Sequence, residues 1–131
     1  DEVLKLNREV SEYVKNQGGL FGAILDHQNR IAAHSIPDRL YTTFEPLIGQ
    51  THEQTIGDVS IEHGKLEDGT DAVTFQRDIT FSGVTIGSAI YAEPADRVFG
   101  ARSRYRIYRI IFINNKDLIE KLLFNFNVYI L

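Results

Sequence analysis

The sequence predicts an α+β domain, in which a long N-terminal helix packs on a central antiparallel β-sheet and a C-terminal helix or strand-helix tail follows. Residues 2–17 have helical periodicity, whereas residues 20–35 and 72–92 each have the pattern of a β-hairpin. A chain of 131 residues suits about one domain with an ordinary core. We therefore expect a main domain over residues 1–98 and a basic tail over 99–131 that packs on or continues it.

The N-terminal helix is predicted from apolar residues at spacings of three and four. These are Val3, Leu6, Val10 and Tyr13. Gly18 and Gly19 follow and end the helix. We expect this apolar stripe to pack on the protein's own sheet.

The first hairpin consists of strands at 20–26 and 30–35, joined by the polar run Asp-His-Gln-Asn. If Leu25 pairs with Ile31, His34 lies opposite Gly22, where the missing side chain leaves room. We therefore predict a small void or a ligand beside His34.

The second hairpin has the clearest pattern in the chain. Apolar residues alternate with polar ones from Ala72 to Phe81, the pair Ser82-Gly83 supplies a turn, and residues 84–92 return as a strand. A two-residue turn with regular pairing places Arg77 opposite Ser88. Arg77 would then lie in the middle of an apolar face.

Between the hairpins the pattern is lost. Residues 36–59 contain Pro37, Pro46, Gly49 and Gly57, which predict a long connection with one short helix. Residues 60–67 are expected to add a strand, and Pro94 suits the first turn of a helix. Long connections inside a compact domain are often functional.

Charge is distributed unevenly along the chain. Residues 1–96 hold 7 Lys or Arg against 16 Asp or Glu, whereas residues 97–131 hold 7 against 2. The arginines of the tail alternate with aromatic residues, as in proteins that bind nucleic acid. Because the remainder is acidic and would repel nucleic acid, we expect no such partner and predict that the tail covers the acidic body.

Catalysis finds little support. The chain has no cysteine, which excludes thiolate catalysis and thiolate metal sites. His52-Glu53 begins an H-E-x-x-H motif, but Ile56 replaces the second histidine. The sequence also lacks a G-x-S-x-G motif, a phosphate-binding loop and an apolar run long enough for a membrane span. We expect no enzyme activity, cofactor or metal.

Three segments carry a family resemblance. They are GGLFGAILDHQNRIAAHS, then IGQ at 48–50, then DITFSGVTIGSAIYAEP at 78–94. They match a pattern of apolar strand, D-x-x-x-R, apolar strand and A-H-S, followed by I-G-Q/K in the next loop and G-x-x-I-G-S in the last strand. The pattern resembles the extracytoplasmic PAS-like sensor domains of the single CACHE (PDC-like) family, which have a profilin-like layout, over about residues 3–98. Residues 99–131 depart from it, because charges interrupt the second transmembrane span that the family has there.

The resemblance implies a receptor module of a membrane-anchored protein. Such domains lie outside the cytoplasmic membrane in histidine kinases, chemoreceptors and cyclic-nucleotide enzymes. They bind a small molecule over one face of the sheet, under the long loop, and the ligand shifts the helices that lead to the membrane. Their N-terminal helices often pair in a dimer.

Two residues are the leading candidates for ligand contact. An unpaired guanidinium on an apolar face is costly, so Arg77 is a candidate to hold a carboxylate or amino-acid ligand. The alternative is that Arg77 lies at the sheet edge or pairs with a carboxylate of the protein. His34 contacts a ligand in the space over Gly22, or else is satisfied by the backbone.

Further candidates follow from the family's pocket. Arg39, Tyr41 and His52 lie in the loop that walls it, and Ser88 and Tyr91 lie on the last strand. The alternative for each is an ordinary solvated side chain.

A second class of function is a dimeric protein-interaction scaffold of the roadblock or longin type. This class shares the helix and the first hairpin but has a long central helix after them. Pro37, Pro46, Gly49 and Gly57 disfavour such a helix in residues 36–59. The sensing module is therefore the preferred hypothesis.

Overall fold

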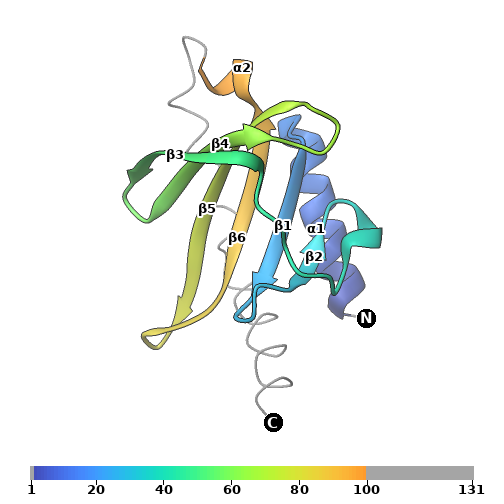
Figure 1. Ribbon diagram of the computed structural model, residues 1–131. Helices are drawn as coiled ribbons and strands as arrows, with labels where there is room; N and C mark the ends of the chain where they lie inside the picture. Colours follow the sequence, from blue (N-terminus) through green and yellow to red (C-terminus); the bar gives the residue numbers. More distant parts are fainter. Residues whose placement is uncertain (1, 100–131) are drawn as a thin grey trace.

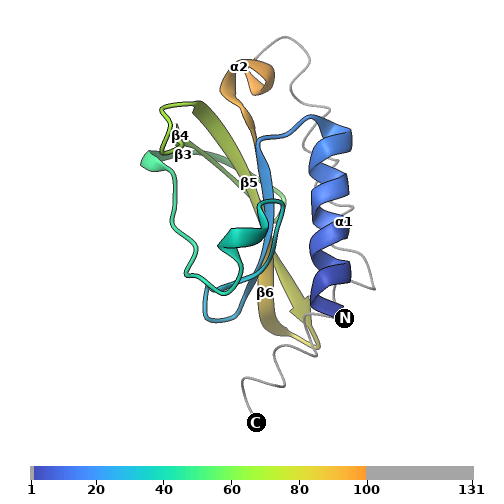
Figure 2. The same ribbon diagram turned by 90° about the vertical axis from the view of Figure 1, so that its right-hand side faces the viewer.

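A computed structural model describes residues 2–99 as one long helix on a six-stranded antiparallel sheet (Figures 1 and 2). The elements are α1 (Glu2–Gln17), β1 (Phe21–Asp26), β2 (Ile31–His34), the 3-10 helix η1 (Pro37–Arg39), β3 (Ile48–Ile56), β4 (Val59–Lys65), β5 (Asp71–Phe81), β6 (Val84–Pro94) and α2 (Ala95–Val98). The strand order is β2-β1-β6-β5-β4-β3. The predicted α+β class is confirmed, whereas the tail predicted from residue 99 onward lies, apart from Phe99, outside the described residues.

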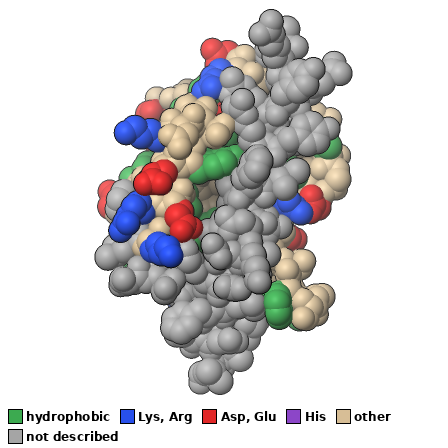
Figure 3. Space-filling model, turned by 180° about the vertical axis from the view of Figure 1, so that it is seen from behind, with side chains coloured by type: hydrophobic (Ala, Val, Ile, Leu, Met, Phe, Trp, Pro, Cys, Tyr) green, Lys and Arg blue, Asp and Glu red, His purple; other side chains and the backbone are tan. Residues whose placement is uncertain are grey.

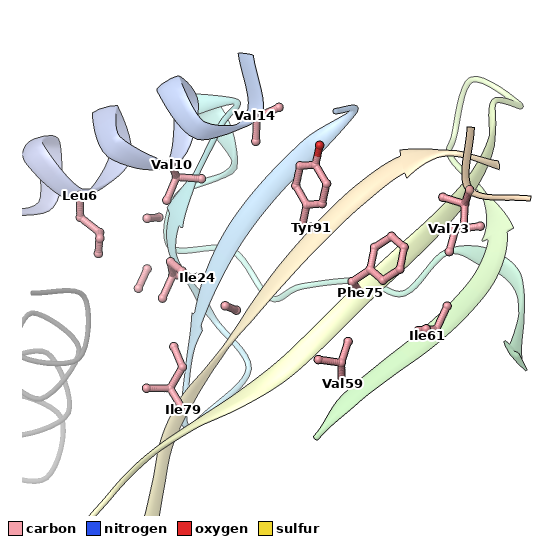
Figure 4. Close-up of a cluster of buried hydrophobic side chains, with 14 of the residues drawn as sticks. Leu6, Val10, Val14, Ile24, Val59, Ile61, Val73, Phe75, Ile79 and Tyr91 are labelled. Carbon is pink, nitrogen blue, oxygen red and sulfur yellow. The ribbon is translucent and has the colours of Figure 1, made fainter. Parts of the chain in front are cut away.

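Helix α1 packs on its own sheet. Leu6, Val10 and Val14 are buried against the face that carries Ile24 and Tyr91 (Figure 4). Burying an aliphatic side chain of this size contributes about 1.5 to 3 kcal/mol, so this stripe holds the helix in place. The exposed side of α1 carries charges of both signs. The surface seen from behind in Figure 3 likewise shows basic and acidic side chains next to one another. The sheet is thus the observed partner of the predicted stripe.

Two sets of hydrogen bonds hold the C-terminal end of α1. Gly18 has a φ of 69°, and its N–H and that of Gly19 donate to the carbonyls of Lys15 and Val14, at 3.3 and 3.0 Å. These two bonds form a Schellman motif. The guanidinium of Arg97, in α2, also donates to the carbonyls of Gly18 and Gln17. Arg97 therefore links the element after the last strand to the end of the first helix.

The first hairpin has a bulge that the sequence did not reveal. Leu25 pairs with Ile31 as predicted, but an irregularity between Ile24 and Leu25 shifts the register, so that His34 lies opposite Ala23. The prediction that His34 faces Gly22 is therefore wrong. Ser35 lies beside Gly22 instead, because its N–H donates to the Gly22 carbonyl at 2.9 Å and its hydroxyl accepts the Gly22 N–H at 3.0 Å.

A second bulge changes the other hairpin. The register of β5 and β6 shifts between Ile79 and Thr80, so Arg77 pairs with Ala89 and Asp78 with Ser88. The predicted pairing of Arg77 with Ser88 is therefore wrong. A shift of one residue moves a side chain to the other face of a sheet. Arg77 and Ser88 consequently lie on opposite faces.

Strand β3 replaces the second half of the predicted connection. It pairs with β4 at the edge of the sheet, and all nine of its residues are exposed. The expected short helix is present as η1, and residues 60–67 contribute β4 as predicted. Residues 36–59 therefore lack the long central helix that a roadblock or longin scaffold requires.

The two faces of the sheet have different covers. Helix α1 lies on one face, and residues 35–47, which we call the covering loop, lie on the other (Figure 2). We call the second face the loop face. The loop face corresponds to the side of the sheet on which the family resemblance predicts a ligand.

Candidate functional site

The covering loop runs from one edge of the sheet to the other. It first follows β2, where the Tyr41 N–H donates to the Ile31 carbonyl and the Ile31 N–H donates to the Thr42 carbonyl, each at 2.8 Å. It then crosses the loop face to β3 (Figure 1). At its end a Cβ on Gly64 would lie 2.7 Å from Leu47, so only glycine lets the loop approach β4 this closely.

One half of the loop face is apolar. Phe21, Leu25 and Ile90 form a buried cluster with other side chains of β1, β2 and β6, and Leu40 and Phe44 of the covering loop pack on it. The Phe21 and Phe44 rings lie 6.3 Å apart. This contact fixes the covering loop over β1 and β6.

The other half of the loop face is polar. The residues are Ser60 and Glu62 of β4, Thr74 and Gln76 of β5, Ser88 of β6 and His52 of β3, and we call this set the polar floor. Strand pairing sets Glu62 between His52 and Thr74, and Ser60 beside Gln76. The polar floor thus spans four neighbouring strands.

Hydrogen bonds connect most of the polar floor. The Gln76 amide donates to the Ser88 hydroxyl at 3.1 Å, and the Ser60 hydroxyl donates to Glu62 Oε1 at 2.6 Å. The same oxygen is 2.9 Å from His52 Nδ1. Burial opposes ionisation of Glu62, but the bonds from Ser60 and His52 outweigh it and hold the pKa of the carboxyl below its usual value. Glu62 is therefore an ionised carboxylate near neutral pH.

Thr74 takes no part in these hydrogen bonds of the polar floor. Its side chain is 1% exposed, and its hydroxyl has no hydrogen-bond partner among the described residues. A buried hydroxyl without a partner costs about 1 to 3 kcal/mol. Thr74 lies next to Glu62 on the neighbouring strand, so the uncompensated group belongs to the polar floor.

His34 lies at the opposite side of the loop face. Its ring stacks on Phe21 with centroids 5.4 Å apart, and its Nδ1 accepts the Ile36 N–H at 2.9 Å. Burial and the positive charge of Arg39 lower the pKa of His34 to about 4, although Asp38 opposes the shift. The imidazole is therefore neutral at pH 7, with its proton on Nε2.

The two candidates from the covering loop lie outside the polar floor. Arg39 forms an ion pair with Glu67, at 3.9 Å. Tyr41 is 62% exposed and has a φ of 66°. Arg39 acts on His34 through its charge, while Tyr41 points to solvent.

Arg77 and Tyr91 lie on the α1 side of the sheet. The Arg77 guanidinium is 2.8 Å from Asp58, which is the protein carboxylate foreseen as the alternative partner. The Tyr91 side chain lies on the side of the sheet that faces α1 (Figure 4). Its ring packs edge-on against Tyr13, and its hydroxyl donates to Glu93 at 3.1 Å. Burial, followed by the negative charge of Glu93, raises the pKa of Tyr91. The ligand roles of both residues stay predictions.

Of the seven predicted site residues, His52 and Ser88 belong to the polar floor, where they lie on β3 and β6 with β4 and β5 between them. The sequence analysis missed Ser60, Glu62, Thr74 and Gln76. Their signal was present, since Thr74 and Gln76 are the polar members of the alternating β5 pattern. The alternating pattern predicts that Thr74 and Gln76 face solvent, because it does not show that a loop distant in sequence packs on the same face of the sheet.

Among residues 2–99, no three His, Asp or Glu side chains are arranged to hold a metal ion. No helix in this range is long and apolar enough to cross a membrane.

Comparison with known proteins identifies a solved structure of the same fold. No protein-family model matches the chain, and no curated protein matches it. The crystal structure of the E. coli DcuS sensor domain is similar with a TM-score of 0.50 and 15% sequence identity, covering 81% of this chain and 71% of that one. The chain therefore shares the α+β fold of that sensor domain.

Proposed function

We propose that the chain is an extracytoplasmic small-molecule sensing domain of the single CACHE type, within a membrane-anchored signalling protein. The observation that carries this proposal is the polar floor beside the covering loop, which contains the Thr74 hydroxyl that has no partner among residues 2–99. The fold shared with a sensor domain supports the same function. A ligand that bonds to Thr74 would recover energy that the unliganded domain lacks.

A path from the loop face to both ends of the described domain supports signalling. Strand β6 carries Ser88 on the loop face and runs into α2, where Arg97 holds the end of α1. A ligand changes the output only if its affinity differs between two arrangements of the domain. We infer that the arrangements differ in how β6 and α2 sit against α1.

The test is a thermal-shift screen of the 131-residue chain with amino acids, organic acids and amines, followed by calorimetry. A true ligand at one hundred times its dissociation constant stabilises the fold by about 2.7 kcal/mol. Gln76→Ala should lower the affinity for that ligand, whereas Gln54→Ala, on the exposed β3, should leave the affinity unchanged. A screen without any binder, or equal binding by both variants, would reject the loop-face site.

The homodimer through α1 stays a proposal as well. Because Val10 is buried against the sheet, a dimer has to use the exposed, charged side of the helix, which includes Arg8 and Glu12. Light scattering of the chain and of Glu12→Lys tests this. A mass of one chain in both samples would exclude the helix dimer at that concentration.

A further inference from the structure

We propose that the ligand of the polar floor carries a cationic amine, which the Glu62 carboxylate holds. This inference rests on the proposed sensing function and replaces the expectation of an anionic ligand.

The cations of the sheet and its loops are already engaged. Four form ion pairs, which are Arg30 with Asp26, Arg39 with Glu67, Lys65 with Asp71 and Arg77 with Asp58. Arg97 donates to backbone carbonyls. Within residues 2–99 the polar floor contains no Lys or Arg, so this part of the chain offers an anionic ligand no unpaired guanidinium or ammonium group there.

The polar floor instead offers a free anionic oxygen. Ser60 and His52 both contact Oε1 of Glu62, whereas Oε2 has no partner in the described part of the chain. Asp78, directly opposite Ser88 on the same face, is exposed and has no described partner either. These two carboxylates thus border a surface that, within residues 2–99, has no matching Lys or Arg.

Thr74 supplies an independent observation. Its buried hydroxyl, next to Glu62 across the strand pair, lacks a partner among residues 2–99. A hydroxyl accepts hydrogen bonds as well as donating one, and an ammonium group has three donors and no acceptor. An ammonium between Glu62 and Thr74 would satisfy both with charge-assisted bonds.

The long-range charge acts in the same direction. Residues 1–96 hold 7 Lys or Arg against 16 Asp or Glu, so this part of the chain attracts cations and repels anions. Because the side chain of Glu62 is partly exposed, this attraction should weaken with added salt.

The main pair of probes has the same four-carbon chain and opposite charge. Calorimetry of the 131-residue chain compares putrescine with succinate, and methylamine with acetate. We expect at least one amine to bind and neither acid to bind. Glu62→Gln should lower the affinity for the amine at least tenfold, which corresponds to about 1.4 kcal/mol of binding free energy. Glu12→Gln, at an exposed position of α1, should leave the affinity unchanged.

The outcomes separate this inference from the proposed function. Binding of acids alone, or amine binding that Glu62→Gln leaves unchanged, overturns the amine proposal and leaves small-molecule sensing intact. Failure of all four probes to bind overturns the amine proposal, and the wider thermal-shift screen then decides whether the proposed sensing function holds. Circular dichroism of both variants confirms that each one folds.

Discussion

His34 accepts the backbone N–H of Ile36 on Nδ1 at 2.9 Å, so its neutral imidazole closes the turn from β2 into the covering loop. A protonated ring would lose this acceptor and would lie close to the positive charge of Arg39. The protonation state of one side chain is therefore tied to the position of the covering loop.

This relationship predicts an acid-sensitive stability. The pKa of His34 is lowered from 6.5 to about 4 in the folded domain, while the unfolded chain keeps the ordinary value. The unfolded state therefore binds an extra proton as the pH falls from about 6.5 towards 4, and the free energy of unfolding should fall by about 1.4 kcal/mol per pH unit at most. Above pH 7 the contribution of His34 is fully present and constant.

Urea unfolding of the wild type and of His34→Asn between pH 7.5 and 4.5 measures this effect. The carbonyl of asparagine can still accept the Ile36 N–H but does not titrate, so the variant should lose less stability on acidification. His27→Asn, in the exposed β1–β2 turn, controls for the loss of one histidine. Equal slopes for the wild type and His34→Asn would contradict the assignment.

Thr74→Val is predicted to stabilise the unliganded domain. Valine has nearly the same shape as threonine and removes a buried hydroxyl that has no described partner, which should raise the free energy of unfolding by about 1 kcal/mol. The same variant should bind the ligand more weakly. Thr80→Val, at an exposed position of the same strand, is the control, and destabilisation by Thr74→Val would show that its hydroxyl is satisfied.

Gly87→Ala is predicted to damage the pairing of β1 with β6. A Cβ at Gly87 would collide with the backbone carbonyl oxygen of Leu25, which cannot move without breaking the strand pair. We expect a loss of about 2 kcal/mol or more in denaturant unfolding, as for other overpacked positions. Ser88→Ala, one residue further along β6, tests whether any change in this strand has the same effect.

The helices and strands were predicted more accurately from the sequence than the side of the sheet on which each side chain lies. The bounds of α1 followed from its apolar spacing, and the two hairpins followed from alternation and turn residues. Strand β3 was missed because an edge strand exposed along its whole length has no apolar alternation to detect. Its stability comes from pairing with β4, which a local pattern does not record.

The bulges explain why the candidate site was predicted only in part. One extra residue near Ile79 moved Ser88 to the face opposite Arg77, and one near Ile24 moved His34 from Gly22 to Ala23. Such shifts depend on how neighbouring strands twist and pack rather than on the residue types. His52 was identified as a loop residue, yet its partner Glu62 depends on the pairing of β3 with β4.

Tyr91→Phe is predicted to separate stability from binding. The Tyr91 hydroxyl donates to the buried Glu93 on the α1 side of the sheet, so its loss should cost about 1 to 3 kcal/mol of unfolding free energy. Because this hydroxyl lies on the face opposite the polar floor, ligand affinity should stay unchanged. Calorimetry showing weaker binding by a fully folded Tyr91→Phe would place the ligand on the α1 side.

Arg97→Gln is predicted to loosen the junction between α2 and α1. The guanidinium donates to the carbonyls of Gly18 and Gln17, where the partial negative charge of the helix end favours a cation. Its loss should cost about 1 kcal/mol and accelerate amide hydrogen exchange at Gly18 and Gly19, since these amides depend on the same turn. Arg97→Lys keeps the charge and should retain part of the protection. Unchanged exchange in Arg97→Gln would show that the Schellman motif alone holds this end of α1, and a signalling path through β6 and α2 would then need another contact.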